Sequence, residues 1–268
     1  METTLAYLTI AIVLAALLIN TIATQIARAR RDSIVLRNIR AYAAMPQYIG
    51  ESLETDRPVH FSFGSLTPGG VAAPLTLANA ETFTLLATRT TYGTNTPLLT
   101  TSEVATLPIG YDILRRAYRT QGRLNQFQIG AVQWYPDGAR SLAFAAALTA
   151  AMADRRTGAN ILLGGFGSEL ALILDAATRR GQRAIAASDQ LDGQAIAYAM
   201  SDELLVGEEM FVGGAYLGGR AAQTGAVVSL DTLRVLLILT LGFLALDQLL
   251  QGALLAQLAR MLNVGGGG

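Results

Sequence analysis

The sequence contains no cysteine and no lysine, and its only histidine is His60. Without cysteine there is no disulfide framework, no thiolate metal site and no cysteine nucleophile. A single histidine excludes a metal site built from several histidines. Charged residues make up 15% of the chain, and 20 arginines balance 20 acidic residues. A chain with no overall basic field is not expected to be a dedicated nucleic-acid binder.

Apolar residues are abundant: 51% of the 268 residues are hydrophobic, and the mean hydropathy is +0.38. This composition excludes a disordered chain, a coiled coil and an ordinary well-solvated globule. The first apolar run holds 22 residues without a charge, from Leu5 to Ile26. As a helix it would measure roughly 33 Å, enough to cross a bilayer. Because arginines follow at once and no basic residue precedes it, we expect residues 5–26 to form an uncleaved transmembrane helix.

A second apolar run begins at Leu233, and Val235–Leu246 is free of charge. These twelve residues alone are too few to span a bilayer, but the leucine-rich pattern continues past Asp247 to Leu258. We expect residues 233–258 to form a second transmembrane helix. The alternative is an amphipathic helix that lies in the membrane interface.

Arginine placement indicates how these helices would be oriented. Five arginines lie in a basic juxtamembrane segment, residues 27–40, and none precedes the first helix. The positive-inside rule then places the middle of the chain in the cytoplasm and both termini outside the inner membrane. Anionic headgroups are a better match for these arginines than nucleic acid, because they lie beside the bilayer. They are Arg28, Arg30, Arg31, Arg37 and Arg40.

Between residues 41 and 220, short apolar runs alternate with helical stretches, which is typical of parallel crossovers. We expect a cytoplasmic α/β domain with a mostly parallel sheet, and a flexible tail at residues 263–268. The expected strands are 59–64, 97–101, 127–135, 160–163, 183–187 and 203–206, and the expected helices are 77–92, 109–120, 139–155, 168–179 and 190–200.

Two stretches of this domain resemble a known family: NILLGGFGSE at residues 160–169 and LVGEEMFVGGAYL at residues 205–217. Over most of its length the chain is similar to a family of two-span membrane proteins from green non-sulfur bacteria and some archaea. That family has no assigned activity. The resemblance implies an anchor, a domain and a second anchor, and it implies no reaction.

The loop Gly164–Gly167 lies between an expected buried strand and an expected helix. Parallel α/β sheets bind anions at such loops, because backbone N–H groups are free and the helix dipole points at them. Asp189 follows 22 residues after Gly167, close to the spacing of the ribose-binding acid in dinucleotide folds. The weak candidates for a cofactor-binding site are therefore Gly164, Gly165, Gly167, Ser168 and Asp189.

Two features of the same loop favour a purely structural turn, and no cofactor is assigned. Leu170 stands where the dinucleotide fingerprint has its third glycine. Glu169 falls in the first helical turn, where its carboxylate would occupy or repel an anion. A structural turn is expected to need Gly167, because its backbone angle would be disfavoured for other residues.

The remaining polar residues give weaker evidence, and no catalytic residue or metal ligand is assigned. Glu208 and Glu209 follow the last expected strand, near Asp202 and Glu203, and could bind Mg²⁺ or act as acid and base. The competing interpretation is a solvated strand end. His60 is expected to be a half-buried packing residue within an apolar strand.

Polar side chains in the second membrane segment predict a homo-oligomer. A charge deep in a bilayer costs about 2.5–3.5 kcal/mol, so Asp247 should face protein rather than lipid. Two or more copies could share Asp247, Gln248 and Gln251 across a symmetric helix contact. The alternative is that Asp247 reaches the outer interface on a shorter span. The small-residue segment Gly213–Gly219 is either a packing contact or a flexible hinge.

Two functions from different classes fit these features. The first is a non-enzymatic, membrane-anchored assembly or scaffold protein whose cytoplasmic domain self-associates or docks to a larger membrane complex. The second is a membrane-tethered enzyme or sensor that binds a small nucleotide-like anion at Gly164–Gly167. The first is favoured because the sequence holds no complete catalytic set.

The expected topology can be tested with reporter fusions at Gly138, in the middle of the domain. A reporter that is active only in the cytoplasm should be active there, and tags at either terminus should be reachable from outside the cell. An external signal at Gly138 would contradict the proposed orientation.

Overall fold

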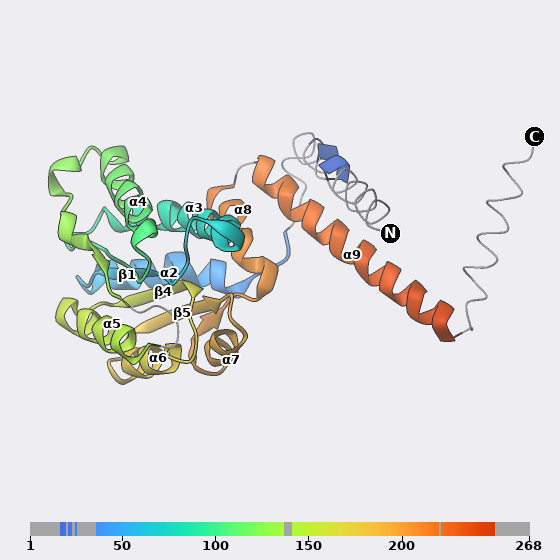
Figure 1. Cartoon of the computed structure of the whole chain (residues 1–268). Coiled ribbons are helices and arrows are strands. Elements are labelled where there is room, and N and C mark those ends of the chain that lie inside the picture. Colours follow the sequence, from blue (N-terminus) through green and yellow to red (C-terminus); the bar gives the residue numbers. More distant parts are fainter. Residues whose placement is uncertain are drawn as a thin grey trace, which may run out of the picture. The chain divides into compact units, whose positions relative to one another are not determined.

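The computed structural model describes residues 17–19, 21–22, 25, 36–136, 141–219 and 221–249 (Figure 1). The chain divides into two compact units. One is the continuous segment Leu36–Arg220, called the α/β unit below, and the other combines Met1–Val35 with Ala221–Gly268.

The α/β unit is built on a six-stranded sheet in the order β3-β2-β1-β4-β5-β6, and every strand pair is parallel. The expected parallel α/β class is therefore confirmed. The order reverses between the central strands β1 and β4, which are buried along their whole length. The strands are β1 Val59–Gly64, β2 Leu98–Thr101, β3 Val132–Trp134, β4 Ala159–Gly165, β5 Arg183–Ser188 and β6 Glu203–Leu204.

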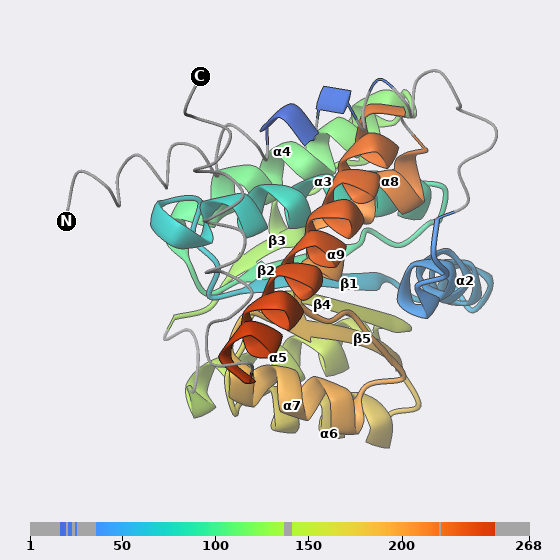
Figure 2. The same cartoon turned by 90° about the vertical axis from the view of Figure 1, so that its right-hand side faces the viewer.

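Helices cover both faces of the sheet, which explains why its strands read as continuous apolar runs. Figures 1 and 2 show α3 and α4 on one face and α5, α6 and α7 on the other. α2 contacts α3 and strands β4 to β6, and α8 packs on α3. These helices are α2 Arg40–Glu54, α3 Ala73–Thr90, α4 Leu107–Thr120, α5 Leu142–Arg155, α6 Leu170–Arg179, α7 Leu191–Met200 and α8 Gly213–Gly218.

Each face of the sheet has its own apolar core. On one side Phe83 of α3 packs on Phe61 and Phe63 of β1, with ring centroids 5.3 and 4.7 Å apart. On the other side Phe144 and Phe166 belong to a cluster formed by α5, α6, α7 and the strands β4 and β5. Because both faces are fully packed, ligand space is restricted to the sheet edges and the helix surfaces.

The expected elements differ from the observed ones mainly at their ends. The strand expected at 127–135 is reduced to β3, because 3-10 turns occupy Leu124–Gln126 and Ile129–Ala131. Helix α2 was not expected at all. It includes Arg40, which the sequence analysis had placed in a basic juxtamembrane segment, and it contains Pro46.

The described residues do not support the expected membrane helices. Within them, no helix is long and apolar enough to cross a membrane. Most of residues 5–26, all of 250–258 with Gln251, and the tail 263–268 lie outside the described residues. Helix α9, Ala221–Leu249, includes residues 233–249 of the second expected segment, with Asp247 and Gln248.

A row of buried polar side chains crosses the sheet. The Nε2 atom of His60 lies 2.8 Å from the Thr100 hydroxyl, and its Nδ1 atom lies 3.2 Å from Oδ1 of Asn160. Asn160 in turn donates to Oε1 of Gln182 at 3.0 Å. The amide oxygen can only accept, so we assign the ring proton to Nδ1. His60 is fully buried rather than half-buried, and burial lowers its pKa from 6.5 to about 4.

This burial predicts a pH dependence of stability. Between pH 6.5 and 4 the unfolded chain binds a proton at His60 while the folded chain does not, so the free energy of unfolding falls as the pH falls. The loss should total about 3 kcal/mol by pH 4. Urea unfolding at several pH values should show this slope in the wild type, while His60→Gln, which cannot titrate, should lack it. Parallel slopes in the two proteins would contradict the assignment.

Candidate functional site

The glycine loop expected to bind an anion is buried, and its N–H groups already have acceptors. The Gly167 N–H donates to Oε1 of Glu169 at 2.9 Å, and the Phe166 N–H donates to Oγ of Ser188 at 3.1 Å. Ser188 returns a hydrogen bond to the Phe166 carbonyl at 2.6 Å. Glu169 thus occupies the place of an anion, as its position in the sequence indicated. An external anion would have to displace this carboxylate from Gly167.

The crevice between β1 and β4 is closed at the point where the strand order reverses, which is where open α/β sheets commonly bind ligands. The Ser65 N–H donates to the Gly165 carbonyl at 2.8 Å. The segment after β1 therefore stays hydrogen-bonded to the end of β4. A Cβ atom on Gly164 would overlap the Phe63 carbonyl, and one on Gly64 would overlap the Gly165 carbonyl. Glycine is therefore required by close backbone approach.

The expectation that the backbone angle of residue 167 requires glycine was wrong. Gly167 does not have a positive φ, whereas Gly64 has a φ of 57°. Helix α7 and the glycine loop are packed equally closely, because a Cβ on Gly193 would overlap the Phe166 carbonyl. The loop is thus held by packing from two sides rather than by an unusual backbone angle at Gly167.

Asp189 lies beside this loop but in a different environment. It follows β5 and lines a cavity of about 600 Å³ at the carboxyl ends of β5 and β6. The glycine loop does not line this cavity, so the structure separates the two parts of the expected site. Ser168 is exposed on the surface. Loss of water around Asp189 raises the pKa of its carboxyl group, and its own backbone N–H lowers it by less.

The carboxylates on either side of β6 are bonded within the α/β unit. Arg37 pairs with Glu209 at 3.0 Å and with Glu208 at 3.4 Å. The other carboxylate oxygen of Glu209 accepts the Val206 N–H at 3.0 Å. Asp202 accepts the Ala184 N–H at 2.8 Å. These contacts match the structural interpretation of the acidic residues, and they involve Arg37 in protein contacts rather than in a free basic surface.

Two stacked tyrosines complete this contact, which we call the end clamp (Arg37, Tyr42, Glu208, Glu209 and Tyr216). The rings of Tyr42 and Tyr216 lie 5.1 Å apart. Tyr42 donates to the Glu209 carbonyl at 2.5 Å, and Tyr216 donates to the Arg37 carbonyl at 2.7 Å. Burial raises the pKa of Tyr42, with a smaller contribution from Glu209. The end clamp joins the first residues of the α/β unit to its last helix.

The small-residue segment at 213–219 forms helix α8 and packs on α3. A Cβ atom on Gly213 would overlap Oγ1 of Thr82 on α3. Gly213, Gly214 and Ala215 are buried. Of the two interpretations left open by the sequence, the structure gives a packing contact for this part of the segment.

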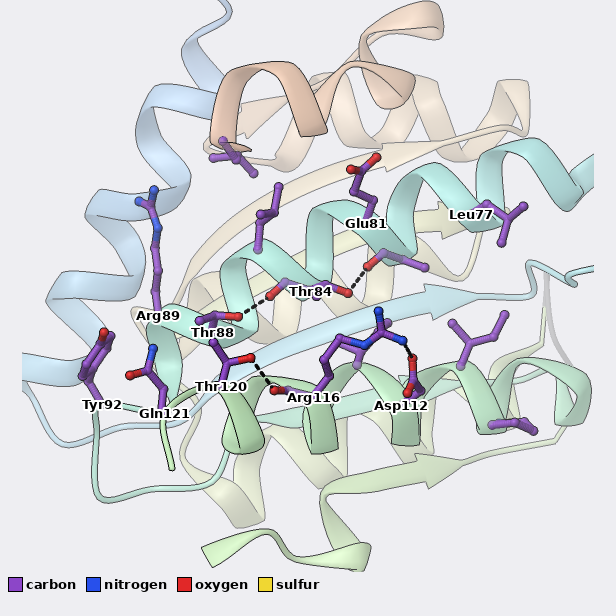
Figure 3. A pocket seen from close by; sticks show the side chains of 16 residues that line it. Leu77, Glu81, Thr84, Thr88, Arg89, Tyr92, Asp112, Arg116, Thr120 and Gln121 are labelled. Carbon is purple, nitrogen blue, oxygen red and sulfur yellow. Dashed lines mark hydrogen bonds and ion pairs between the residues drawn. The ribbon is translucent and has the colours of Figure 1, made fainter. Parts of the chain in front are cut away.

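A groove of about 960 Å³ lies between α3 and α4 (Figure 3). Leu217 of α8 also lines it. Its threonines turn their hydroxyl groups inward: Thr84 donates to the Ala80 carbonyl at 2.7 Å and Thr88 to the Thr84 carbonyl at 2.8 Å. A partner in the groove would therefore contact the methyl groups of these threonines.

Charged side chains from both helices border this groove. Figure 3 shows Glu81 and Arg89 on α3, and Asp112 with Arg116 on α4. Arg116 and Asp112 form an ion pair of 2.6 Å along α4. This groove is not predicted from the sequence, although the helical spacing of its α3 residues is visible there. Within the described part of the chain, no group of three or more acidic or histidine side chains could hold a metal ion.

Comparison with known proteins places the chain in a family but assigns no activity. A family model described as a domain of unknown function matches residues 3–258. No curated protein and no solved structure matches the chain. The match supports the resemblance to a family without an assigned activity. The two-span arrangement and the occurrence in particular organisms stay predictions.

The close approach of β1 and β4 makes Gly164 a sensitive position. Gly164→Ala should lower the free energy of unfolding by about 1–3 kcal/mol, because the new Cβ meets a backbone carbonyl that cannot move aside. Gly130→Ala is the matched control, since a Cβ there meets nothing within 4 Å. Thermal or urea unfolding of both variants measures the difference. Equal stabilities would show that the strand ends can separate.

Proposed function

Because the chain belongs to the DUF6754 family, whose description assigns no activity, we propose its function from its geometry. We propose a non-enzymatic, membrane-anchored assembly protein of the inner membrane. Residues 5–26 and 233–258 are its anchors, the α/β unit is cytoplasmic, and both termini are outside. The α/β unit associates with a second copy through the α3–α4 groove.

The observation that carries this proposal is the order of side chains along α3. Leu77, Glu81, Leu85 and Arg89 of α3 line the groove, and so does Tyr92, two residues after the helix ends. Glu81 and Arg89 are eight residues apart, which is about 12 Å along a helix. Leu85 lies midway between them. The charges and the apolar groups are therefore close to self-complementary about Leu85.

A second copy packed antiparallel along α3 would use this order. A two-fold axis at Leu85 brings Glu81 of each copy opposite Arg89 of the other, and Leu77 close to Tyr92. Leu77 and Tyr92 are 60% and 65% exposed, so the contact would remove apolar surface from water. Opposite charges fix the register, because a shifted register would bring like charges together.

The polar groups outside the groove also support assembly over catalysis. His60 is buried with both ring nitrogens bonded. Glu208 and Glu209 are paired with Arg37, and Asp202 is bonded to the backbone. The residues that suggested acid–base or metal chemistry therefore have structural partners.

The membrane segments would supply a second contact between copies. Asp247, Gln248 and Gln251 are the polar residues that a symmetric helix pair could share. Asp247→Leu should then alter the stoichiometry of the complex in detergent. This contact is separable from the groove, because the two sets of residues lie in different units of the chain.

Charge reversal tests the groove contact. Glu81→Arg and Arg89→Glu should each raise the dissociation constant of the oligomer roughly tenfold, because each places two like-charged pairs across the two-fold axis. The double variant Glu81→Arg/Arg89→Glu should restore the affinity, since both pairs are re-formed with reversed polarity. Dilution series by mass photometry or sedimentation of the full chain in detergent measure these constants.

The control is Glu54→Arg, a charge reversal at an exposed residue of α2 that does not line the groove. It should leave the dissociation constant unchanged. A wild-type monomer would contradict the assembly function itself. Single reversals without effect, or a double variant as weak as the singles, would show that copies associate elsewhere.

A further inference from the structure

The cavity beside Asp189 is formed by three separate segments at the carboxyl ends of the strands. Val71 comes from the 3-10 turn before α3 and Leu75 from the first turn of α3. Asp189 follows β5, and Met210 and Phe211 lie in the segment after β6. Its volume of about 600 Å³ is within the usual range for small-molecule sites. The carboxyl edge of a parallel α/β sheet is also where such sites are commonly found. The crevice between β1 and β4 is closed, whereas this cavity at the same edge is open to solvent.

Most polar side chains of the cavity are already bonded within the protein. Gln194 accepts the Ser188 N–H at 2.8 Å and donates to the Leu205 carbonyl at 2.8 Å. Ser188 bonds to Phe166 and accepts the Gln190 N–H at 3.0 Å. Among the polar side chains that line the cavity, those of Asp189 and Gln190 show no hydrogen bond or ion pair to another residue in the described part of the chain, and Asp189 has only its own backbone N–H nearby.

The charge of this cavity is negative. Of the described residues that line it, Asp189 alone is ionisable, and none is an arginine. The nearest backbone donors of the glycine loop, at Phe166 and Gly167, are occupied by Ser188 and Glu169. Among the described residues, no basic side chain lines the cavity to compensate the charge of an anion. In the part of the chain that the structure describes, Asp189 belongs to no group of three or more acidic or histidine side chains that could hold a metal ion.

The walls and the rim of the cavity are apolar. Val71 and Leu191 are 100% and 88% exposed at its mouth, and Phe211 is 47% exposed. Exposed apolar side chains around one acidic group suit a ligand that is apolar over most of its surface and carries one positive group. Such a ligand has an apolar body for the rim and a positive head for the carboxylate.

We propose that this cavity binds a small organic cation, an ammonium group attached to an apolar body, with Asp189 as its counter-ion. An ammonium group would give the Asp189 carboxylate a partner of opposite charge through a charge-assisted hydrogen bond. The site is independent of the α3–α4 groove, since the two share no lining residue. An assembly protein with this cavity would respond to an amine rather than to a nucleotide.

Three probes of the same shape and different charge test this proposal. They are 2-phenylethylamine, which is cationic, 2-phenylethanol, which is neutral, and phenylacetate, which is anionic. Calorimetric titration of the full chain in detergent should show saturable binding of the amine. The alcohol should bind at least about tenfold more weakly, and phenylacetate should show no binding. Equal binding of all three, or preferred binding of phenylacetate, would overturn the proposal.

Two variants locate the binding. Asp189→Asn removes the charge from an exposed side chain and should raise the dissociation constant for the amine about tenfold or more. Val71→Arg places a competing cation at the fully exposed rim and should act in the same direction. Asp175→Asn on α6 removes an acid outside the cavity and should change nothing. Amine binding that is unchanged in Asp189→Asn and Val71→Arg would reflect uptake by the detergent and would refute the site.

Discussion

The approach of β1 to β4 is the constraint on which the rest of the α/β unit depends. Glycines at the carboxyl ends of both strands let backbone meet backbone, and the pairing continues through Ser65 and Gly165. Side chains at Gly64 or Gly164 would force these ends apart. The sheet can therefore reverse its strand order without opening a crevice at the reversal.

This closure determines where the unit can interact with other molecules. Anion-binding groups of the glycine loop are used inside the protein, by Glu169 and Ser188. Accessible space remains at the β5–β6 edge, next to Asp189, and on the outer surface of α3 and α4. One surface is acidic and concave, while the other carries both signs of charge. They are suited to different partners, a small cation and a second protein surface.

The sequence was sufficient for elements whose signals are local. The run from β4 to β5 has apolar strands that are followed by glycine, serine or aspartate, and its limits were predicted to within about two residues. Helix α2 was missed because its apolar positions, such as Tyr42 and Ile49, surround Pro46 and follow a basic segment. The position of Glu169 at the start of an expected helix also indicated that its carboxylate would compete with an anion. In the structure this carboxylate accepts the Gly167 N–H.

The remaining features depend on contacts between distant residues. Arg37 and Glu209 are separated by 172 positions, and no local pattern indicates that they pair. The groove requires α3 and α4 to lie side by side, and the closed crevice requires Phe63 to meet Gly164. Periodicity identifies the face of a helix that is buried, but it does not identify the neighbouring element.

The end clamp affects whether the α/β unit could be inserted into another polypeptide chain. Tyr216 bonds to the backbone of Arg37, so the polypeptide enters and leaves the α/β unit at nearly the same point. A unit with adjacent ends can be inserted into a surface loop of a host protein without stretching the host. Evolution or a protein engineer could therefore move residues 36–219 as a cassette, and the host would need to supply only two neighbouring attachment points.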